Sequence, residues 1–185
     1  MPMALWIVIA VIIVLILAII GIYNNLVNQK MKVKNAWAQI DTQLKRRFDL
    51  IPNLVETVKG YMVHEQTTLE KVIQARNSFT SADGIKTKAE ANNELSNSLK
   101  SIFALAEAYP ELKANENFNA LQKELSTTED KIAYARQFYN DTVQMYNTAI
   151  MSFPSNILAG MFGFKEEAFF EVTDAKEREN VKVQF

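Results

Sequence analysis

The feature that most constrains this chain is an uncharged apolar run near its N-terminus. The run reads "ALWIVIAVIIVLILAIIGI", from Ala4 to Ile22, and contains no charged side chain. As an α-helix, roughly 19 residues span about 28 Å, which is close to the ~30 Å thickness of the hydrocarbon core of a bilayer. The run therefore predicts a helix that crosses a membrane.

A cleaved signal peptide is the competing interpretation of this run. Such a peptide begins with basic residues, has a shorter apolar region of about 7–15 residues and ends at a small-residue cleavage site. Here no Lys or Arg precedes the run, and the sequence "IIGIYNN" at its end is not such a site. We therefore expect an uncleaved single-pass anchor over residues 1–23.

Basic residues follow the predicted span and set its expected orientation. Lys30, Lys32 and Lys34 come first, and a second cluster follows at Lys45, Arg46 and Arg47. Flanks rich in Lys and Arg remain on the cytoplasmic side of a membrane. The sequence thus predicts an N-terminus outside and a cytoplasmic body.

The composition of the remaining chain favours an all-helical body. The 185 residues include only five Gly and four Pro, and there is no Cys. The absence of Cys excludes a disulfide framework and a thiolate metal site. A formal net charge of −1 gives no overall basic surface for nucleic acid, so we expect no nucleic-acid partner.

The clearest helical pattern is a heptad stripe, which predicts a helix over residues 115–153. Large and small residues alternate on this stripe with the 3,4 spacing of a bundle seam, and Pro154 follows it. Such a stripe is more typical of a core than of a cofactor site. Its large members are Phe118, Leu125, Ile132, Tyr139, Tyr146 and Phe153.

Three further helices are expected at about 24–50, 52–80 and 86–109. Pro52 suits the first position of a helix, so the chain either turns there or one long helix kinks. We favour the turn, because one helix from Ala4 to Phe79 would be over about 100 Å long. The predicted fold is therefore all-α: a transmembrane helix, an antiparallel up-down-up-down four-helix bundle with long helices over residues 24–153, and a C-terminal apolar segment and tail over residues 154–185.

The apolar segment "SFPSNILAGMFGFK" then emerges at the membrane-proximal end of the bundle, because the fourth helix runs back toward the membrane. Three roles fit it: a cap on the bundle core, a membrane interface or a contact with a partner. The candidate contact residues are Phe153, Ile157, Leu158, Met161, Phe162 and Phe164, together with the basic Lys30, Lys32 and Lys34.

Catalytic motifs are weak in this sequence. His64 is the sole His, and "HEQTT" lacks the second His of a zinc-binding H-E-x-x-H motif. A di-iron bundle needs paired E-x-x-H motifs, which one His cannot supply. No phosphate-binding glycine motif is present. We therefore predict that the protein is not an enzyme and holds no cofactor or metal.

The segments "YNNLV", "VKNAWAQIDTQLKRRFDLIPNLVETVKGY", "TEDKIAYARQFYNDTVQMYN" and "SFPSNILAGMFGF" resemble the LemA family. The resemblance covers nearly the whole chain from Tyr23 to Phe164. It implies a single-pass bacterial membrane protein with a four-helix bundle, located in the cytoplasmic (inner) membrane. It also implies kinship with magnetosome-associated relatives, and membrane metalloproteases or TPM-domain proteins as partners. It supplies no catalytic residues.

Two functions fit these observations. The first is a non-enzymatic scaffold that forms homo-oligomers or binds partner proteins at the cytoplasmic face of the bacterial membrane. The second is a regulatory or signalling subunit of a membrane protease or envelope-stress system. The chain shows no separate output domain, which favours the scaffold.

Overall fold

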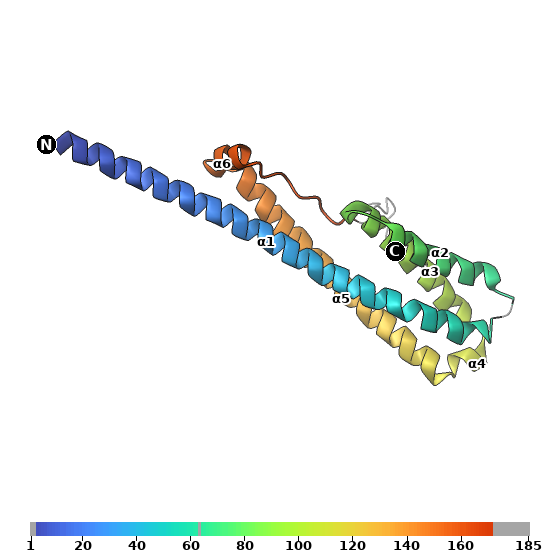
Figure 1. Cartoon of the computed structure of the whole chain (residues 1–185). Helices are drawn as coiled ribbons and strands as arrows, with labels where there is room; N and C mark the ends of the chain where they lie inside the picture. Colours follow the sequence, from blue (N-terminus) through green and yellow to red (C-terminus); the bar gives the residue numbers. More distant parts are fainter. Residues whose placement is uncertain (1–2, 63, 172–185) are drawn as a thin grey trace, which may run out of the picture. The chain divides into compact units, whose positions relative to one another are not determined.

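A computed structural model describes residues 3–62 and 64–171, and the secondary structure in these ranges is entirely helical (Figure 1). The predicted all-α class is therefore confirmed. The elements are α1 (Met3–Lys59), α2 (Gln66–Ser81), α3 (Ile85–Ala106), α4 (Pro110–Lys113), α5 (Glu116–Met151) and α6 (Ser155–Phe162).

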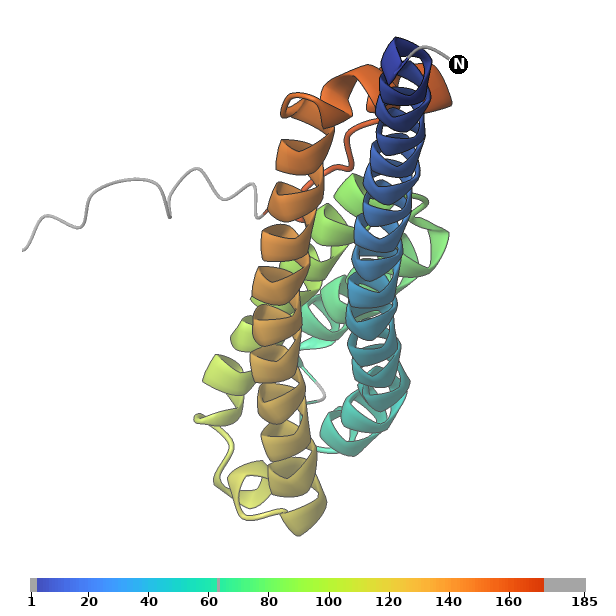
Figure 2. The ribbon, with the colours of Figure 1, turned by 90° about the vertical axis from the view of Figure 1, so that its left-hand side faces the viewer.

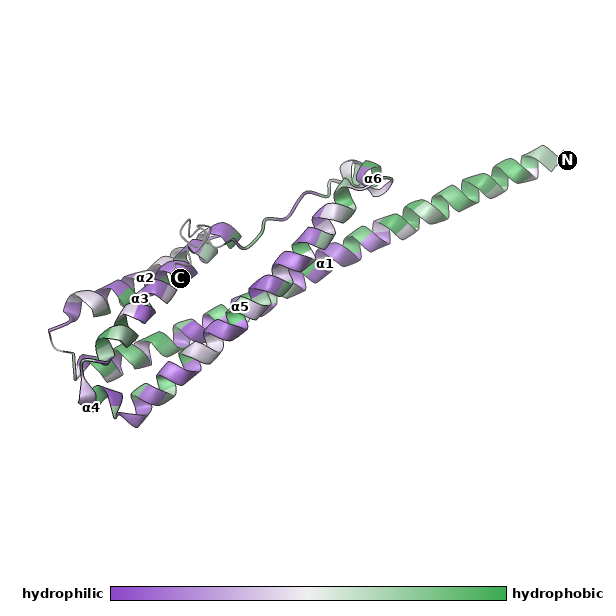
Figure 3. Cartoon of the chain, turned by 180° about the vertical axis from the view of Figure 1, so that it is seen from behind, coloured by the Kyte–Doolittle hydropathy of each residue, from purple (hydrophilic) through white to green (hydrophobic). Residues whose placement is uncertain are grey.

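The N-terminal part of α1 carries the predicted span. Within the described residues, α1 is the single helix that is long and apolar enough to cross a membrane. No part of its most apolar stretch is buried by the rest of the chain, and Figure 3 shows this stretch as predominantly hydrophobic. A helix that is apolar all round and has no protein cover needs an apolar solvent, so it has the character of a membrane anchor.

The chain divides into two compact units, and α1 and α5 each contribute to both. Among the described residues, unit 1 comprises 3–40 and 135–168, and unit 2 comprises 41–62, 64–134 and 169–171. In unit 1 the C-terminal part of α5, orange in Figure 2, runs beside α1. Trp37 of α1 meets Tyr139 of α5 edge to face, with 5.7 Å between ring centroids.

In unit 2, side-chain contacts fix the directions of the helix pairs. Phe48 of α1 stacks on Phe79 near the end of α2 at 4.0 Å between centroids, so these two helices are antiparallel. Lys88 near the start of α3 binds Asp41 at 2.8 Å, and Asn92, about one turn later, accepts from Arg47 at 2.9 Å. Both helices therefore advance in the same direction, and α3 runs parallel to α1. The turn between α2 and α3 contains Gly84, whose φ of 90° is a backbone conformation that favours glycine.

The predicted turn before Pro52 is wrong, because α1 continues through this residue to Lys59. A proline inside a helix costs about 3 kcal/mol. The apolar stripe of α1 continues on both sides of it, however: Ile51 before the proline and Leu54 and Val58 after it are each completely buried. Each such side chain contributes roughly 1.5–3 kcal/mol on burial, which outweighs the lost hydrogen bond. The chain reverses instead after Lys59.

Of the remaining predicted helices, one is divided in the structure and two differ from the observed helices only at their ends. The helix predicted over 52–80 is divided between the end of α1 and α2, whereas those predicted over 86–109 and 115–153 correspond to α3 and α5. Five of the six large stripe residues of α5 are buried, as expected for a core. The exception is Phe153, which is 80% exposed because α5 ends at Met151.

Candidate functional site

The predicted contact segment folds into the short helix α6 and the residues on either side of it. Leu158 and Ala159 are buried and attach α6 to unit 1. The other apolar side chains of the helix are largely open: Ile157 is 55% exposed and Met161 is 73% exposed. A side chain at Gly160 would meet nothing within 4 Å. One face of α6 is thus seated on the protein and the other is uncovered.

Aromatic contacts place α6 beside the end of the apolar run of α1. The Tyr23 ring meets Phe162 at 4.8 Å and Phe164 at 5.9 Å between centroids, both edge to face. Tyr23 is the first residue after the run Ala4–Ile22. The sequence-based expectation that this segment lies near the end of the span therefore agrees with the contacts in unit 1.

The predicted basic residues are only partly brought into this site. The ammonium nitrogen of Lys30 lies 5.8 Å from the ring centroid of Phe164, close enough for a cation–π interaction. Lys32 and Lys34 are exposed on α1. Among the predicted apolar residues, Leu158 faces the protein and Phe164 is half-buried, so neither offers much free surface. We call the uncovered residues Phe153, Ile157, Met161 and Phe162 the α6 surface.

Polar side chains of α5 hold the chain that follows α6, a feature that we did not predict. Residues 164–168 form neither helix nor strand, and we call them the strap. The Tyr139 hydroxyl donates to the carbonyl oxygen of Ala168 at 2.8 Å, and the Tyr146 hydroxyl donates to that of Lys165 at 3.0 Å. The Asn147 amide both donates to the carbonyl oxygen and accepts from the N–H of Glu167, each at 3.0 Å.

Burial changes the acidity of the two phenols that hold the strap. Burial raises the pKa of Tyr139 to about 12, and the Glu167 carboxylate acts in the same direction. The pKa of Tyr146 is also raised, for the same reasons in the same order. Both phenols therefore remain protonated donors over the physiological range. The sequence offered one signal, since a buried Tyr needs a hydrogen-bond partner that a Phe would not.

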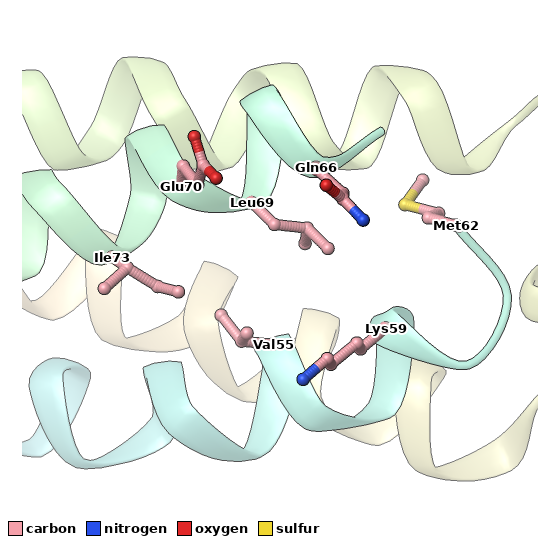
Figure 4. A pocket seen from close by; sticks show the side chains of 7 residues that line it. All are labelled: Val55, Lys59, Met62, Gln66, Leu69, Glu70 and Ile73. Atoms are coloured by element: carbon pink, nitrogen blue, oxygen red, sulfur yellow. The ribbon is translucent and has the colours of Figure 1, made fainter. Parts of the chain in front are cut away.

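A second open surface lies in unit 2, where side chains of α1 and α2 line an apolar groove of about 400 Å³ (Figure 4). An adjoining hollow of similar volume shares Val55, Lys59 and Ile73 with it, so the two form one continuous groove. We call it the α1–α2 groove. Its charged residues are of both signs. They are Glu56 and Lys59 from α1 and Glu70 and Arg76 from α2.

Unit 2 also contains a buried cation. Arg47 is 3% exposed, forms an ion pair with Glu129 of α5 and donates to Asn92 of α3 at 2.9 Å and to Ser96 at 3.0 Å. Burial lowers its pKa, and the Glu129 carboxylate counteracts that effect. The arrangement ties three helices together, and its charge is already balanced within the protein.

Groups of three or more metal-ligating side chains are absent from residues 3–62 and 64–171. His64 is exposed in the connection between α1 and α2. The site residues that the structure does bring together are thus aromatic, aliphatic and basic, a composition suited to binding apolar or anionic surfaces.

The sequence model of the LemA family matches residues 36–185. The chain belongs to the LemA family. It is 27% identical to Protein LemA of Metamycoplasma hominis, over 84% of this chain and 71% of that protein. It is also 23% identical to Magnetosome protein MamQ 2 of Paramagnetospirillum magneticum and 24% identical to Magnetosome protein MamQ of Magnetospirillum gryphiswaldense. Each of these alignments covers 80% of this chain but only 64% of the magnetosome protein.

The residues matched by the LemA family model include most of the candidate site. The LemA match includes α6, the strap, the α1–α2 groove and the Arg47 cluster, because all of them lie after residue 35. Tyr23 and the apolar run precede it. The names of these relatives state no enzymatic activity.

Proposed function

We propose that this LemA-family protein is a non-enzymatic, membrane-anchored helical scaffold that self-associates and binds partner proteins at the cytoplasmic face of the bacterial membrane. The observation that carries the proposal is the α1–α2 groove: an open apolar surface on a helix, α1, that also carries the anchor. A protein that joins a membrane span to an open apolar groove has the minimal parts of a scaffold.

In this proposal the four longer helical segments of unit 2, which belong to α1, α2, α3 and α5, form an up-down-up-down bundle. The support is the alternation of directions: α1 and α2 are antiparallel, α1 and α3 are parallel, and Phe103 of α3 meets Phe118 at the start of α5. Five of the six large residues of the α5 heptad stripe are buried within the chain, so the stripe is not free to form a coiled coil with another chain. Self-association therefore uses other surfaces.

The α1–α2 groove suits a second copy of the chain. It carries two acidic and two basic side chains around apolar walls. In a two-fold symmetric pair the same surface meets itself, so opposite charges on one groove can each face a partner on the other. Membrane metalloproteases and TPM-domain proteins are further proposed partners.

Association is tested on the full chain extracted in detergent. Ile73 lines the groove and is 40% exposed, so Ile73→Asp places a charge in the interface without emptying a core position. We expect light scattering to show an oligomer for the unmodified chain and a smaller particle for this variant. Met145→Asp is the matched control, because Met145 is 62% exposed and lies outside the groove. A monomeric unmodified chain, or equal loss in both variants, would contradict the proposal.

The proposed orientation has its own test. The chain has no Cys, so Lys123→Cys, at an exposed position of α5, introduces a unique thiol. An impermeant thiol reagent that demonstrably reaches the outer face of the inner membrane should fail to label it until the membrane is opened. Labelling in intact cells would show that the body lies outside.

A further inference from the structure

No other part of the described chain covers the α6 surface, and its position indicates which kind of molecule contacts it. Ile157 and Met161 lie one helical turn apart on α6, and Phe153 lies in the turn that precedes this helix. These three side chains are 55%, 73% and 80% exposed. Large apolar side chains with this exposure, gathered in one short segment, mark a contact with lipid or protein.

The contacts with Tyr23 favour lipid. The apolar run that ends at Ile22 has no cover within the chain and matches the thickness of a hydrocarbon core. Tyr23 therefore lies where the hydrocarbon gives way to the headgroups, a level that Tyr and Trp prefer. Phe162 packs against Tyr23, so α6 lies at this level too. The outer face of α6 is then continuous with the apolar surface of the anchor.

Charge supports the same assignment. Lys30, which sits over the Phe164 ring, comes seven residues after Tyr23, or about 10 Å along the helix. That distance is close to the ~10 Å Debye length at 0.1 M salt, within which anionic lipids attract basic side chains. Lys32 and Lys34 are exposed just beyond it. The segment from Phe153 to Phe164 contains no acidic residue that an anionic surface would repel.

We propose that the α6 surface inserts into the interface of the leaflet from which the body emerges, with Lys30, Lys32 and Lys34 facing anionic headgroups. The inference rests on the proposed anchored function and names the surface that α6 contacts. A single helix leaves unit 1 free to rotate about the anchor axis and to tilt. A second attachment through α6 fixes one side of unit 1 against the bilayer.

The test uses the full chain in nanodiscs of mixed neutral and anionic lipid, with one environment-sensitive fluorophore attached at Met161→Cys. Gln137→Cys is the control. It is exposed two residues from Tyr139, which meets Trp37 about 20 Å along α1 from Tyr23. We expect a blue-shifted emission and strong quenching by lipids brominated on their acyl chains at position 161, and neither effect at position 137.

A variant in which Lys30, Lys32 and Lys34 are all changed to Gln should lose part of the quenching at position 161 and respond less to the anionic fraction of the lipid. An emission at position 161 like that of the control would overturn the inference. So would a blue shift without lipid quenching, because protein would then cover α6. The particle mass in the same nanodiscs reports self-association separately, so a failed lipid contact and a failed scaffold give different results.

Discussion

Substitution of Asn147 is the most direct test of how the strap is held. Asn147 is 6% exposed and makes two hydrogen bonds with the backbone of Glu167. Asn147→Leu keeps a side chain of similar size but removes both bonds. Each such bond contributes about 0.5–1.5 kcal/mol net. The backbone groups that lose their partners belong to Glu167, which is partly exposed, so water can replace part of the interaction.

We therefore expect Asn147→Leu to lower the free energy of unfolding by about 1–3 kcal/mol. The more direct measurement is hydrogen exchange. The amide of Glu167 should be protected in the unmodified chain and should exchange faster in the variant, together with its neighbours in the strap. Peptide-level mass spectrometry of the detergent-solubilised protein resolves this change, and chemical denaturation gives the stability.

Gln144→Leu is the matched control, because Gln144 is an exposed amide on the same helix. The control should leave both the exchange at Glu167 and the stability nearly unchanged. If the two variants behave alike, or if the Glu167 amide remains slow to exchange in Asn147→Leu, the strap is held by other interactions and the reasoning is refuted.

For three further substitutions the direction of the change in stability can be predicted. Glu129→Gln should lower the free energy of unfolding, measured by chemical denaturation, by about 1–3 kcal/mol. This is less than the ~3–5 kcal/mol expected for a fully buried pair, because the Glu129 side chain beside Arg47 is 44% exposed. Glu124→Gln, at an exposed ion pair, should lower it by less than about 1 kcal/mol. The stability contributed by the raised pKa of Tyr139 is complete below about pH 10 and is lost as the pH rises through about 12, so Tyr139→Phe should show a smaller fall in melting temperature between about pH 8 and about pH 11 than the unmodified chain. Pro52→Ala should raise the free energy of unfolding by up to about 3 kcal/mol, and a decrease would mean that the packing of α1 depends on the proline.

Periodicity made the core of α5 predictable from sequence. Leu125 and Ile132 are 2% exposed, and both lie on the heptad stripe. This works because a helix must bury one continuous face, and the spacing of apolar residues reveals which face that is. The same argument extended the predicted helix beyond its observed C-terminal end. Phe153 continues the heptad in sequence, but the chain has left the helix before reaching it.

Pro52 shows where a local rule gives way to tertiary packing. Proline favours the first position of a helix and disfavours its interior. The choice between a turn and a continuous helix depends on whether the following apolar residues are buried on the same side, which a local rule does not evaluate. Leu54 and Val58 are buried, and the reversal occurs beyond Lys59.

The strap and the α1–α2 groove were missed for a different reason. Residues 164–168 have no helical or strand periodicity, and their backbone groups find partners on side chains more than fifteen residues earlier in the chain. The groove is made by side chains such as Val55 and Ile73, which are only partly buried. Sequence patterns separate buried from exposed positions, but they do not show which intermediate positions line a common surface.

The placement of α6 follows from these tertiary interactions rather than from its own helical tendency. A helix of eight residues is too short to be stable alone, because isolated helices need about 12–15 residues. Its position is supplied by the burial of Leu158, the ring contacts of Tyr23 and the strap that follows it. These interactions order a helix while leaving Ile157 and Met161 in the open. In water that exposure contributes no stability, whereas at the end of a membrane span the same side chains find an apolar environment.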